Sequence, residues 1–263
     1  QQLSLKQAHE LRKSRASPPK IISNELARAI PSSEAKSLTS RLCAALSFEL
    51  TTAQQRVWSQ IGKDLQASYP MNRLLQGDVG SGKTIVAALA AAHMVERSYQ
   101  VAIMAPTEIL AEQHYTGLID FANSLGIEIA LLTGSTKKSQ RTILHEKLKN
   151  GEVKILIGTH ALIEDKVQFK NLGLAIIDEQ HRFGVEQRSK MWKKNEYPPH
   201  VLVMTATPIP RTLAMSVYGD LDISVIDELP PGRKEIATAH RYDKNRLSVF
   251  KFLKEEISKY SNC

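Results

Sequence analysis

The sequence predicts an α/β fold, a mostly parallel sheet with helices on both faces, preceded by a short helical connector. Three observations carry this prediction. Short aliphatic and β-branched runs recur from Phe48 onward, and amphipathic helical stretches separate them. The runs are apolar throughout instead of alternating with polar residues, which is typical of strands buried on both faces. Right-handed crossovers between such strands place binding residues at their carboxyl ends.

The predicted elements alternate in chain order. The predicted strands are Arg73–Gln76, Val101–Ala105, Ile127–Leu132, Lys154–Gly158, Leu174–Asp178, Val201–Thr205 and Asp222–Ile226. The predicted helices between them are Lys83–Arg97, Glu108–Ser124, Gln140–Asn150 and Gly184–Lys194.

Residues 1–47 differ from the rest, because they are polar and helix-forming with Ser/Pro interruptions at "SRASPPK" and "IPSSEAKS". They predict short helices at Leu3–Arg15, Asn24–Ala29 and Glu34–Ala45 and cannot bury a core of their own. At the other end, "LPPGR" indicates a linker, followed by one more helix at Asp243–Lys259. The predicted regions are therefore 1–47, 48–228 and 229–263.

Composition narrows the class of protein. A length of 263 residues, 42% hydrophobic and 24% charged, suits one large globular domain. The longest apolar run, Ile85–Ala92, is too short for a membrane span, and the N-terminal stretch lacks the pattern of a secretory signal. Two distant cysteines, Cys43 and Cys263, argue against a disulfide framework or a zinc site and favour reduced thiols in a cytoplasmic protein. A net charge of +8 permits a polyanionic partner without requiring one.

One motif predicts a phosphate-binding loop. The residues Gly77, Asp78, Val79, Gly80, Ser81, Gly82, Lys83 and Thr84 fit G-x-x-x-x-G-K-[ST]. Glycines allow positive φ and close approach of backbone N–H groups to phosphate oxygens beside a helix start. Lys83 would reach the β- and γ-phosphates, and the Thr84 hydroxyl would bind Mg²⁺. The apolar strand before the loop and the helix after it argue against a glycine-rich turn without function.

The stretch "LAIIDEQH" ends a predicted buried strand on two acids. Asp178 is placed to bind Mg²⁺, and Glu179 to polarise the water that attacks the γ-phosphate. An acidic pair at a strand end is common in surface turns, but the phosphate loop favours the catalytic interpretation. ATP and Mg²⁺ are therefore the expected cofactors, while the use of the energy stays open at this point.

The order of further motifs resembles superfamily 2 DNA and RNA helicases. "GDVGSGKT", "APTEILAEQH", "DEQH" and "MTATPIPRTLA" resemble motifs I, Ia, II and III, and "FELTTAQ" is similar to the Q-type motif. The resemblance extends from Phe48 to about Arg233 and implies a RecA-like P-loop NTPase domain. It implies that Gln54 reads the adenine.

Within the superfamily, the residues of these motifs resemble the RecG-type branch-migration helicases more than other branches. The stretches that carry this are "LTTAQ", "PMNRLLQGDVGSGKT", "DEQHRFGVEQR", "TATPIPRTLA" and "YGDLDISVIDELPPGR". In that family a wedge domain that holds branched DNA precedes the motor, and a second RecA-like domain follows it. The resemblance implies that residues 1–47 connect to a wedge domain and that residues 229–263 begin the second motor domain. The implied activity is ATP-dependent remodelling of forks and Holliday junctions in repair and recombination by a monomeric motor.

The resemblance also assigns roles to single residues. It implies that His181 links the ATP site to motif III, and that Thr205, Ala206 and Thr207 couple hydrolysis to DNA movement. It implies DNA backbone contacts by Pro106, Thr107, Glu108, Gly158, Thr159 and His160. The alternative for Thr107 and Thr159 is helix N-capping. His114 and Trp192 are expected to be packing or surface residues.

Other functions would require sequence features of their own. A P-loop kinase or a transporter ATPase needs an acceptor pocket or a signature loop, and neither pattern is found. A binding module without catalysis is disfavoured by the intact acids and lysine. Another superfamily 2 translocase of the transcription-repair coupling type, or an RNA helicase, is the remaining alternative, because the choice of DNA rests on the resemblance. The family's arginine fingers, worth about 10³–10⁵ in rate, come from the second domain, so this chain alone is expected to hydrolyse little ATP.

Overall fold

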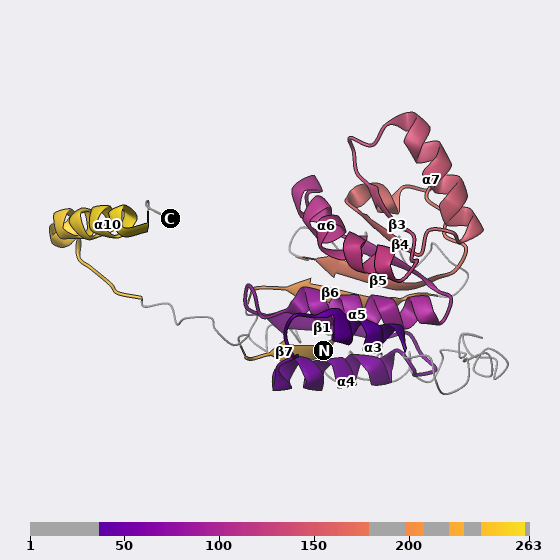
Figure 1. The fold of residues 1–263 in the computed structure, drawn as a ribbon, viewed down its shortest axis with the longest axis horizontal. Helices are drawn as coiled ribbons and strands as arrows, with labels where there is room; N and C mark the ends of the chain where they lie inside the picture. Colours follow the sequence, from indigo (N-terminus) through magenta and orange to yellow (C-terminus); the bar gives the residue numbers. More distant parts are fainter. Residues whose placement is uncertain (1–36, 179–197, 208–220, 229–237, 261–263) are drawn as a thin grey trace, which may run out of the picture. The chain divides into compact units, whose positions relative to one another are not determined.

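A computed structural model describes residues 37–178, 198–207, 221–228 and 238–260. The chain divides into two compact units, Gln1–Pro230 and Pro231–Cys263. The described part of the second unit holds a 3-10 turn, η4 (Asp243–Asn245), and helix α10 (Arg246–Tyr260). All the described strands belong to the first unit (Figure 1).

The first unit is built on a seven-stranded parallel sheet in the order β3-β4-β2-β5-β6-β1-β7. The strands are β1 (Asn72–Gly77), β2 (Gln100–Met104), β3 (Ile129–Leu132), β4 (Ile155–Gly158), β5 (Leu172–Asp178), β6 (His200–Thr205) and β7 (Asp222–Ile226). Their carboxyl ends are level, because Met104 pairs with both Gly158 and Ile177, and Asp178 pairs with Met204. Loops from distant parts of the sequence therefore meet at one edge of the sheet.

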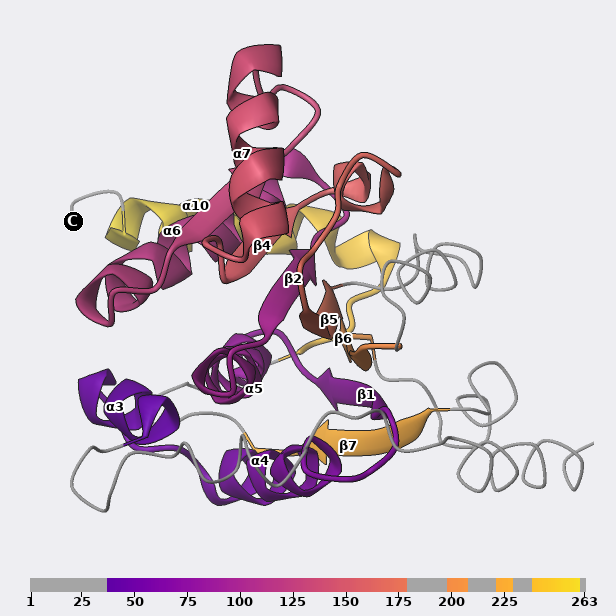
Figure 2. The ribbon, with the colours of Figure 1, turned by 90° about the vertical axis from the view of Figure 1, so that its right-hand side faces the viewer.

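Helices cover both faces of this sheet, as predicted (Figure 2). The helices are α3 (Leu38–Ala45), α4 (Thr52–Asp64), α5 (Lys83–Glu96), α6 (Glu108–Ser124) and α7 (Lys138–Asn150), with a 3-10 turn η2 (His160–Ile163). Helices α3 to α6 share one hydrophobic core, whereas α7 and η2 pack into the core on the other face. Helix α5 is buried at every residue from Val86 to Val95, since it is apolar all round and lies between the sheet and its neighbours.

The structure confirms all seven predicted strands, with bounds that shift by one or two residues. It adds helix α4, which the predicted helices did not include. This helix begins with a capping box in which Thr51 and Gln54 satisfy each other's backbone N–H groups. The predicted helices Leu3–Arg15, Asn24–Ala29 and Gly184–Lys194 lie outside the described residues.

No helix in the described part of the chain combines the length and apolar character that crossing a bilayer requires.

Candidate active site

The phosphate-binding loop predicted from the sequence joins β1 to α5. Gly80 and Gly82 have φ of 76° and 88°, in the left-handed region that favours glycine. Gly82 is also the N-cap of α5 and offers no side chain to its first N–H groups. The first N–H groups of a helix lack the usual carbonyl acceptor four residues earlier, so the start of α5 presents donors and the positive end of a helix dipole to the loop.

Three further observations fit a bound polyphosphate. A Cβ atom on Gly77 would lie 2.5 Å from Ser81 Oγ, so the backbone closes on itself at this point. Ser81 Oγ is buried and has no hydrogen-bond partner among the described residues. The Lys83 ammonium donates to the carbonyl oxygens of Gly77 (2.7 Å) and Asp78 (2.9 Å), which keeps a cation inside the loop. The loop therefore suits an anion with several oxygens.

Gln54 contacts the phosphate loop directly. Its side chain is 1% exposed, and its Nε2 donates to the Ser81 carbonyl oxygen over 2.8 Å. Its Oε1 accepts from the Thr51 N–H over 3.0 Å. A Cβ atom on Gly82 would overlap Gln54 Nε2, so close approach as well as positive φ requires glycine there. The adenine role of Gln54 stays a prediction. The structure adds that the Gln54 side chain links the start of α4 to the phosphate loop through these two hydrogen bonds, and we call this link the Gln54 clamp.

Asp178 ends β5 at the same edge of the sheet, as predicted. Its Oδ2 lies 2.8 Å from His114 Nε2, and the two side chains are 13% and 11% exposed. The sequence predicts that His114 is a packing or surface residue, and the structure adds that it contacts the predicted metal ligand. Thr84 lies in the first turn of α5. A carboxylate and a hydroxyl are hard oxygen ligands of the kind that Mg²⁺ prefers. Glu179, His181 and Trp192 lie outside the described residues.

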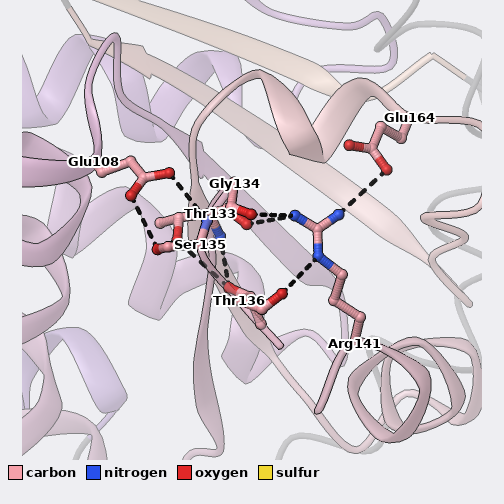
Figure 3. A network of polar contacts seen from close by, with 7 residues as sticks. All are labelled: Glu108, Thr133, Gly134, Ser135, Thr136, Arg141 and Glu164. Carbon is pink, nitrogen blue, oxygen red and sulfur yellow. Dashed lines mark hydrogen bonds and ion pairs between the residues drawn. The ribbon is translucent and has the colours of Figure 1, made fainter. Parts of the chain in front are cut away.

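Residues Pro106, Thr107 and Glu108 follow β2 and begin α6. Thr107 is the N-cap and its Oγ1 accepts from the Leu110 N–H over 3.3 Å, so the capping alternative is observed. The Glu108 carboxylate accepts from the N–H (3.2 Å) and the hydroxyl (2.9 Å) of Ser135. These bonds tie the start of α6 to the loop after β3 (Figure 3).

That loop, residues 133–136, was not among the predicted site residues, and we call it the β3 loop. Arg141 of α7 holds it by donating to the carbonyl oxygens of Thr133 (2.6 Å), Gly134 (3.2 Å) and Thr136 (3.1 Å). The same guanidinium pairs with Glu164 at 3.5 Å (Figure 3). Binding the carbonyls fixes the loop backbone. The signal available in the sequence was "TGST", small polar residues directly after a predicted strand.

Gly158 ends β4, and Thr159 and His160 follow it beside the β3 loop. A Cβ atom on Gly158 would overlap the Leu132 carbonyl oxygen, so only glycine fits where β3 and β4 end. Thr159 precedes η2 without capping it, and its Oγ1 is buried without a partner among the described residues. His160 is exposed. The capping alternative is therefore not observed for Thr159.

Thr205 ends β6, between the ends of β5 and β1, and Ala206 and Thr207 follow it. Thr205 is buried, and its Oγ1 accepts from the Thr207 N–H over 3.1 Å. This bond turns the chain directly at the strand end.

Two acids after β7 contact α4, which the sequence did not indicate. Glu228 accepts from the Ala53 N–H over 2.9 Å, and Asp227 pairs with Arg56 at 2.7 Å. The Arg56 contact lowers the pKa of Asp227. The residues that precede the predicted linker are thus bonded to the helix that carries Gln54.

The fold and the site together define the class: a RecA-like nucleotide-binding motor domain. A family model of the DEAD/DEAH box helicases matches residues 51–216. The chain belongs to the DEAD/DEAH box helicase family.

Comparisons with individual proteins point to one branch. The ATP-dependent DNA helicase RecG of Aquifex aeolicus (strain VF5) is 56% identical over 215 residues, 81% of this chain and 27% of that protein. RecG of Bacillus subtilis (strain 168) is 57% identical over 198 residues, 75% of this chain and 29% of that protein. A structure of RecG bound to a three-way DNA junction matches with a TM-score of 0.78 and 41% identity, covering 98% of this chain and 33% of that chain. The chain spans a third or less of the length of each of these three proteins.

Proposed function

We propose that the chain is the first motor domain of a RecG-type DNA helicase that couples ATP hydrolysis to remodelling of branched DNA. The observation that carries this proposal is the meeting of two sites at one edge of the sheet. The phosphate loop and Asp178 lie at the carboxyl ends of β1 and β5. The motif Ia residues, the β3 loop and Gly158–His160 lie at the carboxyl ends of β2, β3 and β4. The high identity to RecG proteins supports the choice of branch.

The phosphate loop would hold the ATP phosphates. Lys83 would exchange the carbonyl oxygens of Gly77 and Asp78 for β- and γ-phosphate oxygens. Thr84 and Asp178 would hold Mg²⁺, which supplies charge neutralisation at the phosphates. Glu179 would accept the proton of the attacking water.

The second site would bind a nucleic-acid backbone. In the β3 loop, the Ser135 N–H and hydroxyl donate to Glu108, and a phosphate would take these donors over from Glu108. Arg141 meanwhile fixes the loop backbone through its carbonyl oxygens. His160 is exposed beside it, and so is Ile109 in the first turn of α6, at 69%. Contacts of this kind to phosphate and sugar carry no sequence information, which suits a motor that moves along any sequence.

The flanking regions complete the proposal. Residues 1–47 would connect to a wedge domain, and residues 229–263 would begin the second RecA-like domain, which supplies arginine fingers. Such a chain binds nucleotide weakly and hydrolyses little ATP by itself. A monomeric state and a cytoplasmic location stay predictions.

The test is the ATPase rate of the full-length protein with and without forked DNA. We expect forked DNA to stimulate hydrolysis and Lys83→Ala to abolish it. Lys63→Ala is the matched control, because Lys63 is an exposed lysine in the last turn of α4 and should leave the rate unchanged. Absence of stimulation by any DNA would overturn the proposal. Stronger competition by structured RNA than by forked DNA would favour an RNA helicase instead.

A further inference from the structure

We propose that His114 is a positioning residue that transmits occupancy of the nucleic-acid site to the nucleotide site through Asp178. The inference rests on the proposed function, since it assigns the route by which its two sites affect each other. His114 ends the motif Ia stretch, from which only DNA contacts by Pro106, Thr107 and Glu108 were expected, and its contact with Asp178 emerges only from the folded chain.

The contact is short and shielded. His114 Nε2 lies 2.8 Å from Asp178 Oδ2, a good hydrogen-bond distance, and both side chains are nearly nine-tenths buried. A hydrogen bond to a carboxylate in such surroundings is stronger than the same bond in water. The bond occupies one carboxylate oxygen and leaves the second for other ligands. The bond therefore determines the orientation of the Asp178 carboxylate, the predicted metal ligand.

His114 and Asp178 lie on two different kinds of element, a helix that covers the sheet and a strand in the middle of the sheet. Asp178 ends β5, which lies between β2 and β6 in the middle of the sheet. His114 lies on α6, two turns and about 10 Å from the helix start at Thr107. The helix start in turn is tied to the β3 loop through Glu108 and Ser135. Helix α6 thus carries a predicted DNA contact at one end and the Asp178 contact in its body.

Helix α6 therefore connects the two sites. A phosphate that binds at Thr107 or at the β3 loop contacts the start of α6 and can displace the helix, while the central strand keeps the Asp178 backbone in place. A shift of α6 along the sheet changes the His114–Asp178 bond and with it the orientation of the carboxylate. By thermodynamic reciprocity, a nucleotide that binds one orientation better changes the affinity for DNA by the same factor.

The experiment measures that factor in the full-length protein. The dissociation constant of a single-stranded oligonucleotide is determined with and without Mg²⁺ and the non-hydrolysable analogue AMP-PNP, and the ratio of the two is the coupling. Two variants are compared: His114→Leu keeps the bulk and removes the N–H donor, and His114→Gln places an N–H donor at similar reach. Thr116→Ala, an exposed change on the same helix, is the control.

We expect a coupling of fivefold or more in the wild type and in Thr116→Ala, in line with typical allosteric coupling. His114→Leu should bring the ratio to within about twofold of unity, and His114→Gln should restore most of it. The Mg²⁺ concentration needed for half-maximal AMP-PNP binding should rise in His114→Leu alone. A residue that only packs would change the thermal midpoint and leave the ratio as it was. If His114→Leu does not fold, His114→Ala takes its place.

Two failures are distinguishable. A wild type whose ATPase is stimulated by DNA, but whose coupling ratio is unity or persists in His114→Leu, overturns the role of His114 and leaves the proposed function standing. A wild type without stimulation overturns the proposed function and, with it, this inference.

Discussion

Replacing Gln54 by alanine separates two roles for this side chain. If Gln54 serves only to read adenine, its loss weakens nucleotide binding and leaves the nucleotide-free protein as stable as before. The structure instead shows both of its amide atoms bonded within the protein, to Ser81 and Thr51. We therefore expect Gln54→Ala to destabilise the protein without any nucleotide present.

The magnitude follows from the contacts that are lost. Two hydrogen bonds of about 1 kcal/mol each disappear, and the Ser81 carbonyl oxygen loses a buried partner, which costs about 1 kcal/mol more. The other half of the capping box, Gln54 N–H to Thr51 Oγ1, is a main-chain donor and is retained. The expected loss of unfolding free energy is about 3 kcal/mol, or roughly 6–12 °C in thermal midpoint for a domain of this size.

Urea unfolding of the nucleotide-free chain, followed by far-ultraviolet circular dichroism, measures this loss. Gln55→Ala is the matched control, because the neighbouring Gln55 is exposed and, in the described part of the chain, its side chain donates to the Leu50 carbonyl oxygen in an exposed hydrogen bond. It should cost less than about 1 kcal/mol. A Gln54→Ala protein within about 0.5 kcal/mol of the wild type, with weakened nucleotide binding, would refute the clamp.

Three further predictions concern other parts of the domain. Burial holds the pKa of His93 and His200 at about 4, against an ordinary 6.5, so the unfolded state binds more protons between these values and stability falls as the pH drops through that window. Urea unfolding at pH 7 and pH 5 should differ by about 2 kcal/mol per histidine, and His93→Leu should halve the total; an unchanged difference would argue against a neutral His93. Gly158→Ala should cost about 2–4 kcal/mol, because its Cβ meets the Leu132 carbonyl oxygen, and a calorimetric midpoint equal to the wild type would contradict that overlap. Arg141→Lys keeps the charge but cannot reach three carbonyl oxygens, so oligonucleotide affinity should fall several-fold with AMP-PNP affinity unchanged; full affinity in the lysine variant would mean that charge alone matters.

Much of the fold could be predicted from the sequence, because the patterns that indicate strands and helices extend over only a few neighbouring residues. The parallel strands are continuous apolar runs, and each survives in the structure within a residue or two. Helix α4 is not among the predicted helices although its capping box is local as well, since Thr51–Gln54 belongs to the stretch that resembles the Q-type motif. A single stretch can hold a structural and a functional signal at once, and here Gln54 belongs to both.

Contacts between residues far apart in the sequence could not be predicted from the sequence. His114 and Asp178 are 64 positions apart, and Ala53 and Glu228 are 175 apart. Arg141 lies nearer to the β3 loop, yet its three carbonyl acceptors depend on how α7 packs against the sheet. Several of these residues lie in stretches that the sequence analysis singled out, yet nothing in the sequence shows which residue each one contacts, because their neighbours are set by crossover connections between strands.

By itself, the sequence determined the α/β class, the strands, the phosphate loop and the acid at the end of β5, because hydrophobic periodicity and glycine chemistry act over a few residues. Only the tertiary structure decided that the nucleotide loop is clamped by α4, that Asp178 is held by His114, and that Glu108 and Arg141 shape the β3 loop. The physical reason is that the strand order, β3-β4-β2-β5-β6-β1-β7, differs from the chain order. Side chains that share an edge of the sheet come from segments far apart in the sequence, and only packing brings them within hydrogen-bond distance.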